Sequence, residues 1–413
     1  MNINAYKPQG DKKNSAFFEE YCAKIYSRRE SSGLDQLLQN LCAFIIHLES
    51  GDGLPYLEEL ALMTPYRLQT SYINNSHKIY ILRTCNQFPR LIVMEPLSSD
   101  YEDDIKRLNM IYPLARNKPN ARYVGEIMYT KDLKETQDIL ESHNIRFHYP
   151  GETENNFYTG HNIRFTVPSD FTHNRLGYTH IDLEDHSALE LGQPFQLNSK
   201  EQQRLDQVAR LSEELGIHHL IEGVDHMATR VLAGEREDAI LEFLSISNYY
   251  FWGAYNIKEM NSSTNVNRNH TVSDDKLSPA KVFTANNTPS FVNSFENLPM
   301  PTEDFVRNYG RRMHHIAYEV TDGDHISQQK NVDFVVSQLN ENKISFLGDV
   351  IGECSDQPNL KQIFSRQSPY SVLITEYVER CQGFSGFFTR DNVASLTEAA
   401  GHDERYEHGH VFD

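Results

Sequence analysis

Hydrophobic and polar positions recur in the same order twice along the second half of the chain. A run that alternates with the period of a strand is followed by an amphipathic helical pattern and then by further strand-like runs. The first set consists of VDHMATRVL (224–232), GEREDAILEFLSISN (234–248) and NYYFWGAYNIKE (248–259). The second consists of HHIAYEV (314–320), NVDFVVSQLNENK (331–343), ISFLG (344–348), NLKQIFS (359–365) and SVLITEYVE (371–379).

The first half of the chain repeats this order. One copy consists of ARYVGEIMYT (121–130), KDLKETQDILESHN (131–144), IRFHY (145–149), HNIRFTVPS (161–169) and RLGYTHIDLE (175–184). The later strands of a fourth copy are predicted before residue 100, at RLQTSYINN (67–75), KIYILRT (78–84) and RLIVMEPL (90–97).

Four βαβββ units in two pairs, an α+β fold, are therefore the predicted architecture. Paired units of this kind curl into a half-open barrel, with side chains from alternate strand positions pointing inward. The charged helix EQQRLDQVARLSEELG (201–216) is suited to bridge the two pairs. We predict an N-terminal domain over residues 1–200, a bridging helix over 201–217 and a C-terminal domain over 218–413. The asparagine-rich stretch at 261–275 predicts a solvated loop or hairpin.

Charge and cysteine content narrow the function classes. The chain has 39 Lys and Arg against 58 Asp and Glu, and its net charge of -19 repels nucleic acid and acidic membrane surfaces. The N-terminus lacks an apolar signal segment, and no apolar run approaches the roughly 20 residues that span a bilayer. Five cysteines without a CxxC pair favour a reducing compartment and ordinary thiols over a zinc site. We therefore expect a cytoplasmic protein.

Three residues of the second half occupy places that suit a metal site. His226 and His315 lie at equivalent positions in the first strands of successive units, and Glu376 lies in the last strand of the second unit. Two imidazoles and one carboxylate on one face of a metal leave the opposite positions open for substrate and dioxygen, as in non-haem Fe(II) oxygenases. Strand alternation predicts that the neighbouring Asp225 and His314 point to the opposite face.

Four segments of the C-terminal half carry a family resemblance. They are VDHMATRV (224–231), EDFVRNYGRRMHHIAYEV (303–320), LKQIFS (360–365) and TEYVERCQGFSGFF (375–388). Over roughly residues 205 to 400 the chain resembles 4-hydroxyphenylpyruvate dioxygenases, which belong to the vicinal oxygen chelate superfamily. The resemblance implies the vicinal oxygen chelate fold, with a metal site in the C-terminal domain. No metal site is expected in the N-terminal domain, because His180 and His186 have no equivalent histidine in the preceding strand, where Val124 and Glu126 stand.

The resemblance also implies roles for individual residues. His226, His315 and Glu376 become Fe(II) ligands, Gln362 orients the substrate, and Phe384 and Phe388 form the walls around its ring. The chain departs from the family at three places. His314 replaces a glutamine, and GFSGFF (383–388) is a shortened form of a family motif. SFVNSFENLP (290–299) takes the place of a strand that usually ends in Pro-Leu-Asn.

The activity that the resemblance implies is oxidative decarboxylation of an aromatic 2-oxo acid by dioxygen, with hydroxylation of the same molecule. The family also suggests a role in aromatic amino acid catabolism and a homo-oligomer. Two alternatives stay open. One is an extradiol dioxygenase that cleaves the ring of a catechol, for which His314 is the nearest candidate acid or base. The other is a metal-free binding protein that keeps the fold.

Overall fold

The structure is a computed structural model that describes residues 9–10, 12–84, 89–101, 119–149, 158, 160–185, 187–269, 278–289, 300–354 and 357–401. The segment at 290–299, which was compared with a Pro-Leu-Asn strand, lies outside these residues.

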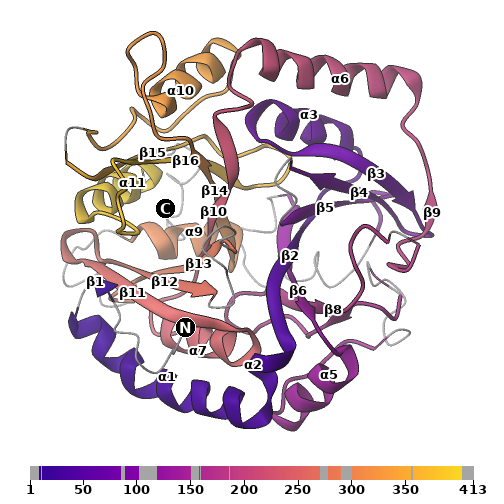
Figure 1. Ribbon diagram of the computed structural model, residues 1–413, viewed down its shortest axis with the longest axis vertical. Coiled ribbons are helices and arrows are strands. Elements are labelled where there is room, and N and C mark those ends of the chain that lie inside the picture. Colours follow the sequence, from indigo (N-terminus) through magenta and orange to yellow (C-terminus); the bar gives the residue numbers. More distant parts are fainter. Residues whose placement is uncertain are drawn as a thin grey trace.

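Within the described residues the core consists of two eight-stranded mixed sheets, each curled into a half-barrel (Figure 1). The N-terminal sheet has the order β7-β8-β6-β2-β5-β4-β3-β9, and the C-terminal sheet has the order β1-β11-β12-β13-β10-β14-β16-β15. The strands of the first are β2 (Leu38–His47), β3 (Arg67–Ile73), β4 (His77–Arg83), β5 (Arg90–Pro96), β6 (Arg122–Thr130), β7 (Arg164–Phe165), β8 (Arg175–Thr179) and β9 (Gln193–Pro194). Those of the second are β1 (Gln9–Gly10), β10 (Ile221–Arg230), β11 (Tyr249–Ile257), β12 (Ser262–Asn269), β13 (Ala280–Asn286), β14 (Arg312–Val320), β15 (Asn359–Phe364) and β16 (Ile374–Cys381).

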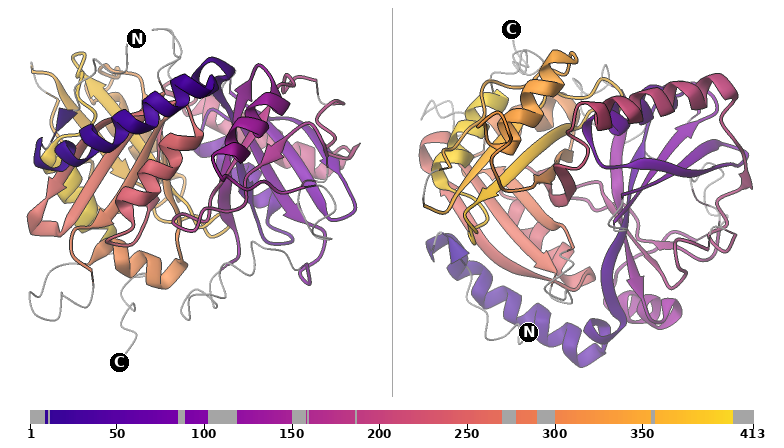
Figure 2. Two further views of the ribbon diagram at one scale, coloured as in Figure 1. Left: turned by 90° about the horizontal axis from the view of Figure 1, so that it is seen from below. Right: turned by 45° about the horizontal axis from the view of Figure 1, so that its top comes forward.

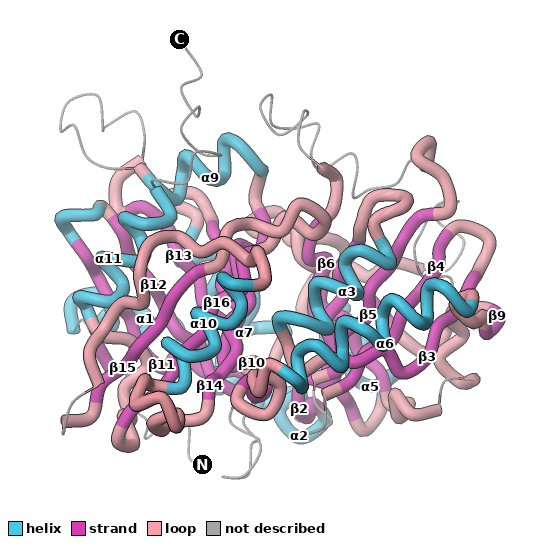
Figure 3. Tube along the Cα trace, turned by 90° about the horizontal axis from the view of Figure 1, so that it is seen from above, coloured by secondary structure: helices cyan, strands magenta, loops and turns pink. Residues whose placement is uncertain are grey.

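Helices pack around both half-barrels (Figure 2), and α11 (Arg390–Gly401) lies over the cavity of the C-terminal half-barrel. They are α1 (Lys12–Ser32), α2 (Leu34–Leu37), α3 (Gly53–Met63), α5 (Leu133–Ser142), α6 (Ser199–Glu214), α7 (Arg236–Ile246), α9 (Pro301–Tyr309), α10 (Asn331–Glu341) and α11 (Arg390–Gly401), with a 3-10 turn at Lys258–Met260. The charged bridging helix is α6, which begins with a capping box at Asn198 and packs against α3 (Figure 3). No helix in the described parts of the chain is long and apolar enough to cross a membrane.

The central strand pair of each sheet has the same antiparallel register, which confirms the predicted pairing of βαβββ units. In the C-terminal sheet β10 and β14 pair antiparallel, with His226 opposite Ala317. In the N-terminal sheet β2 and β6 pair antiparallel in the same way, with Ala43 opposite Ile127. The backs of these central strands face each other across the molecule, where the Tyr123 hydroxyl lies 3.2 Å from the sulfur of Met227. One hydrophobic cluster therefore spans both halves, and the inner face of each half-barrel points away from it.

Several sequence predictions of local structure need correction. The runs ISFLG (344–348) and IRFHY (145–149) form only isolated bridges and no strands. The stretch at 261–275 is predicted to be a solvated loop or hairpin. Residues 262–269 form strand β12, which pairs antiparallel with β11 and β13 and is buried, so the predicted solvent exposure is wrong there; residues 270–275 lie outside the described residues. The serine and asparagine side chains of β12 are buried between neighbouring strands, and such polar residues give no signal of a core strand.

The N-terminal helix packs on the C-terminal sheet. Strand β1 pairs with β11, and α1 lies along β11 and α7. The guanidinium of Arg29, fully buried, donates to the carbonyls of Leu244 and Tyr249. The segment before β2 thus belongs spatially to the second half-barrel, while the boundaries at residues 200 and 217 stay a prediction.

Two neighbouring phenylalanines test how strongly α1 is anchored. Phe18 is 1% exposed and stacks on Phe251 with ring centroids 4.3 Å apart, whereas Phe17 is 38% exposed. Phe18→Ala is expected to lower the free energy of unfolding by about 3 kcal/mol, because it leaves a cavity under the helix. Phe17→Ala is the matched control and should cost less than about 1 kcal/mol. Urea unfolding followed by circular dichroism measures both, and equal losses would contradict the packing described.

The cysteines also differ from expectation. Cys354 and Cys381 form a disulfide, while Cys22 and Cys42 are free and buried. The prediction of ordinary thiols is therefore wrong for this pair, since parity and spacing in the sequence gave no sign of the bridge. Disulfides are more typical of oxidising compartments, so the cytoplasmic location stays a prediction.

Candidate metal centre

Three adjacent strands bring the predicted ligands together. In the row that crosses β10, β14 and β16, His226 lies opposite Ala317 and Ala317 lies opposite Glu376. His315 stands two residues before Ala317 on β14 and so faces the same side. Ala317 itself is fully buried, on the strand between β10 and β16.

The three side chains converge on one point. Nε2 of His226 and Nε2 of His315 are 3.2 Å apart, and they lie 3.1 and 3.2 Å from Oε2 of Glu376. A metal ion about 2.1 Å from each of three mutually perpendicular ligands would separate them by about 3 Å. His226 and Glu376 are almost completely buried, and His315 is 9% exposed. The triangle therefore has the size of a facial ligand set.

Burial and charge shift the pKa values of this cluster. Burial alone would lower the pKa of His226, but the carboxylates of Glu376 and Asp225 raise it to about 9. Burial raises the pKa of Glu376, and the charge of His226 opposes that shift. Burial lowers the pKa of His315 well below its usual range. Burial also opposes ionisation of Asp225, but Arg380 and His226 lower its pKa to about 2. Asp225 is thus paired with Arg380, while Glu376 and His226 influence each other at the centre of the cluster.

Hydrogen-bond chemistry shows that the residues fit a metal ion. Oδ1 of Asp225 lies 2.6 Å from Nδ1 of His226. A carboxylate only accepts, so Nδ1 of His226 donates to Asp225, and Nε2 presents a lone pair once a metal ion displaces its proton. Both carboxylate oxygens of Glu376 are buried without a hydrogen-bond donor of acceptable geometry. Electron-pair donors therefore face one another, and a cation between them would satisfy all three ligands.

The two residues predicted to point away from the site lie beside it. Asp225 contacts Nδ1 of His226, and Nδ1 of His314 lies 2.8 Å from Nδ1 of His315. Strict strand alternation fails because both Asp225 and His314 are extra residues in β-bulges. The prediction that they face the opposite side of the strand is therefore wrong.

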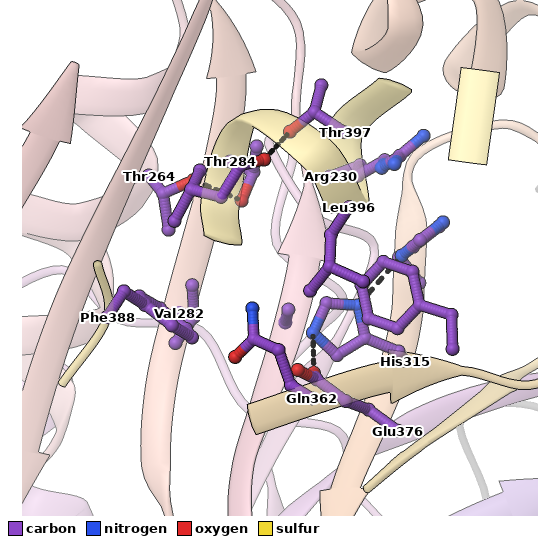
Figure 4. A pocket seen from close by; sticks show the side chains of 14 residues that line it. Arg230, Thr264, Val282, Thr284, His315, Gln362, Glu376, Phe388, Leu396 and Thr397 are labelled. Carbon is purple, nitrogen blue, oxygen red and sulfur yellow. Dashed lines mark hydrogen bonds and ion pairs between the residues drawn. The ribbon is translucent and has the colours of Figure 1, made fainter. Parts of the chain in front are cut away.

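A cavity opens beside two of the three candidate ligands, His315 and Glu376 (Figure 4). Apolar groups supply much of its wall, and a few polar groups point inward; its lining residues are Ala228, Arg230, Thr264, Val282, Thr284, His314, His315, Gln362, Phe364, Glu376, Phe388, Val393, Leu396 and Thr397. Gln362 is fully buried on β15 and projects toward the cavity beside Glu376. Both atoms of its amide lack a hydrogen-bond partner. Such a buried amide is suited to bind a polar group of a ligand.

The phenylalanines of the GFSGFF segment divide into two groups. Phe388 lines the cavity, and its ring centroid lies 5.2 Å from that of His226. Phe387 does not line the cavity but also packs edge-on to His226, at 5.4 Å. Phe384 is partly buried in the same hydrophobic cluster and lies outside the cavity wall. Its role as a ring wall stays a prediction.

Sequence reasoning missed the part of the wall that comes from β12 and β13. Thr264 and Thr284 face the cavity from neighbouring strands, with hydroxyl oxygens 3.4 Å apart. The alternation of AKVFTAN (280–286) is a signal that would have located Val282 and Thr284. Arg230, four residues after His226 on the same strand, was also missed; its guanidinium donates to the carbonyl of Pro301.

A second group of possible metal ligands does not form a site of this kind. Asp322, Glu379 and Cys381 have ligand atoms within 4.8 Å of one another. However, the sulfur of Cys381 is in the disulfide, and the two oxygens of Glu379 accept from the backbone N–H groups of Gly323 and Val332. The carboxylate of Glu379 thus holds the start of α10.

Comparison with known proteins identifies the fold. No family model matches the sequence, and neither does any curated protein. Among solved structures, a mutant of 4-hydroxymandelate synthase from Streptomyces coelicolor aligns with a TM-score of 0.58 and 13% identity, over 88% of this chain and 98% of that one. The chain has the vicinal oxygen chelate fold. A xylose isomerase-like TIM barrel/4-hydroxyphenylpyruvate dioxygenase fusion protein aligns with a TM-score of 0.55 and 11% identity, over 91% of this chain and 57% of the fusion protein.

A third solved structure is less similar. BphC, a halotolerant catechol dioxygenase, has a TM-score of 0.42 and 12% identity over 86% of this chain and 92% of its own. At these identities, the likeness concerns the fold, and the chemistry has to be argued from the residues of this chain.

Proposed function

We propose that this protein is a non-haem Fe(II)-dependent dioxygenase that oxidatively decarboxylates and hydroxylates an aromatic 2-oxo acid. The observation that carries the proposal is the convergence of His226, His315 and Glu376 at the wall of a cavity that also holds an unpartnered amide. Two imidazoles and one carboxylate on one side of a metal are typical of non-haem Fe(II) oxygenases. A 4-hydroxymandelate synthase shares the fold.

Each group in the site has a task under this proposal. When bound, Fe(II) would be the Lewis acid for the carboxylate and keto oxygens of a 2-oxo acid and would supply electrons to dioxygen. His226, His315 and Glu376 hold the ion on one side and leave its cavity side accessible to substrate. Gln362 binds a polar group of the substrate. The rings of Phe364 and Phe388 exclude water from the reacting end.

Oxygen uptake by the Fe(II)-loaded protein tests the proposal. The substrates to compare are 4-hydroxyphenylpyruvate, phenylpyruvate, branched 2-oxo acids and a catechol. Uptake with a 2-oxo acid, together with equimolar carbon dioxide release, is expected. Iron binding without uptake on any 2-oxo acid would contradict this activity. Assignment to aromatic amino acid catabolism, a homo-oligomeric state and a cytoplasmic location remain predictions.

One observation favours a second candidate, an extradiol dioxygenase that acts on a catechol. His314 lines the cavity, where ring cleavage would use an additional acid or base. Its Nδ1, however, is bonded to His315, which makes it a poor proton acceptor for substrate. Uptake with the catechol alone would support this candidate and contradict the first.

Gln362→Met separates a substrate-binding role from a structural one. The amide is fully buried and makes no hydrogen bond, so an apolar side chain of similar shape should leave the free energy of unfolding unchanged or raise it. If the amide binds substrate, KM should rise by about tenfold or more, since a lost hydrogen bond to a charged group is worth about 1.5–3 kcal/mol. The affinity for metal should not change.

The control for this variant is Gln202→Met on the exposed surface of α6. It should change neither KM nor stability. A destabilised Gln362→Met with an unchanged KM would assign Gln362 to the structure alone.

A further inference from the structure

Each of the two histidines of the candidate metal centre has a side-chain partner on the nitrogen that faces away from it. Asp225 lies 2.6 Å from Nδ1 of His226, and His314 lies 2.8 Å from Nδ1 of His315. In both cases the partner is the residue that directly precedes the ligand in the sequence. In a regular strand, neighbouring side chains point to opposite faces and cannot meet in this way.

Two β-bulges make these contacts possible. Along β10, Val224 pairs with Tyr318 and His226 pairs with Ala317, so Asp225 is the extra residue between consecutive positions of β14. A bulge re-aims the side chain of the extra residue. Asp225 therefore turns toward the ring of His226.

The second bulge is on β14. Ala228 pairs with His315 and Thr229 pairs with Met313, which leaves His314 as the extra residue. Its ring packs edge-on against Phe305 and Phe364, at 5.0 and 5.7 Å, so its orientation is fixed by the core.

The N-terminal half serves as an internal comparison, because its strands β2 and β6 correspond to β10 and β14 but carry no candidate ligands. The same two bulges occur there, because Leu41 and Ala43 pair with Met128 and Ile127, and Ile45 and Ile46 pair with Gly125 and Tyr123. The extra residues are Cys42 and Val124. Strand register places Ala43, Gly125 and Gly177 at the positions of His226, His315 and Glu376. The bulges belong to the fold, and only the C-terminal half fills them with hydrogen-bonding residues next to histidines.

Asp225 is itself held in place by Arg380. The guanidinium of Arg380 lies 3.1 Å from both carboxylate oxygens of Asp225, and it packs over the ring of Phe387 at 5.2 Å. Phe387 in turn contacts the ring of His226. Asp225 therefore links the ligand to the segment that carries Phe387 and Phe388.

We propose that Asp225 and His314 are positioning residues that fix the tautomer and orientation of His226 and His315 for metal binding. This inference rests on the proposed metal centre. Asp225 accepts the Nδ1 proton of His226, and Nδ1 of His314 accepts the Nδ1 proton of His315. Both ligands then present Nε2 lone pairs to the same point. Partners of this kind also raise the basicity of a ligand, and their loss typically weakens metal affinity 10- to 100-fold.

Metal affinity of purified variants tests the inference. Fe(II) binding under anaerobic conditions is measured by competition with a chelator, and the visible absorption of the Co(II)-loaded protein reports the ligand geometry. Asp225→Ala is expected to weaken binding about 10- to 100-fold, and Asp225→Asn less, because its amide oxygen still accepts a hydrogen bond. His314→Phe keeps the ring in its aromatic surroundings but removes the acceptor, and should weaken binding about tenfold or more. Each variant should shift the Co(II) spectrum.

Glu319→Gln is the matched control. Glu319 lies on β14, close enough to Asp225 and Arg380 for their charges to influence the pKa of its carboxyl, but it takes no part in the hydrogen bond between Asp225 and His226. Its replacement should leave the Fe(II) affinity and the Co(II) spectrum unchanged. Circular dichroism of the metal-free proteins is used to check that each variant is folded. If Asp225→Ala does not fold, the near-isosteric Asp225→Asn and His314→Phe still test the inference.

The outcomes separate this inference from the proposed function. Wild-type affinity and an unchanged spectrum in folded Asp225→Ala and in His314→Phe would overturn the inference while leaving the metal centre intact. Wild-type protein that binds metal but consumes no oxygen would contradict the proposed activity, and weakened variants would still support the inference. Absence of metal binding by the wild type would overturn both.

Discussion

Replacing Glu376 by glutamine should remove most of the affinity for Fe(II) and abolish oxygen uptake. Glu376 is the only anionic member of the ligand set, and the amide that replaces it is neutral and a weaker donor. The loss should exceed the 10- to 100-fold that follows removal of an outer-shell partner. His226→Ala and His315→Ala should have the same effect, because each removes one corner of a triangle whose edges are 3.1 to 3.2 Å.

The metal-free stability of Glu376→Gln distinguishes a metal ligand from a structural residue. Glu376 is 1% exposed, and burial raises the pKa of its carboxyl. Without metal, the carboxylate is a desolvated charge, so its neutral replacement should leave the free energy of unfolding unchanged or higher. A structural carboxylate would instead destabilise the fold when replaced. Chelator competition and urea unfolding of Glu376→Gln, with Glu319→Gln as the control, make the comparison.

Retained Fe(II) affinity in all three ligand variants would contradict the metal centre. Loss of affinity in only one of them would reduce the ligand set to that residue. Activity lost together with folded structure would say nothing about ligation, which is why the glutamine variant is preferred to alanine at Glu376.

The candidate ligands were accessible to sequence reasoning because they lie on strands with clear patterns. In HHIAYEV and LITEYVE, apolar and polar residues alternate or β-branched and aromatic residues are frequent, and residues typical of turns flank each run. The equivalence of His226 and His315 in successive units followed from the repeat. Their convergence with Glu376 required only that the strands be neighbours in one sheet, which the register of β10, β14 and β16 provides.

The neighbours of the ligands were not accessible, because a bulge leaves no mark in the hydrophobic pattern. Strict alternation placed Asp225 and His314 on the wrong face of their strands. The position of a bulge depends on how two strands pair, and pairing is a property of the sheet as a whole. The resemblance to a known family named the ligands but assigned no role to either residue.

Strands covered on both faces were also missed. In β2 every position from Leu41 to His47 is buried, so its sequence shows no alternation. In β12, buried asparagines and serines resemble a solvated loop. Helix α1 packs on a strand more than 200 residues away, and local patterns do not predict such contacts.

Lys281→Met should be among the most destabilising single substitutions in the chain. Lys281 on β13 and Glu126 on β6 form an ion pair between the two half-barrels, and each residue is 2% exposed. Burial lowers the pKa of Lys281, and Glu126 opposes that shift. Removing the ammonium leaves the carboxylate of Glu126 buried without its partner, which typically costs about 3–5 kcal/mol. Urea unfolding at neutral pH measures the loss.

The double variant Lys281→Met/Glu126→Leu separates the value of the pair from the cost of breaking it. The ammonium lies within 5.3 to 5.9 Å of the ring centroids of Tyr123, Phe243 and Phe283, so apolar replacements have aromatic neighbours to pack against. Replacement of a whole buried pair by apolar residues is often neutral, and most of the lost stability should return. Lys134→Met, which breaks an exposed pair with Asp138 on α5, is the control and should leave the unfolding midpoint unchanged. If the double variant is no more stable than Lys281→Met, the ammonium itself, through its aromatic neighbours, stabilises the contact between the half-barrels.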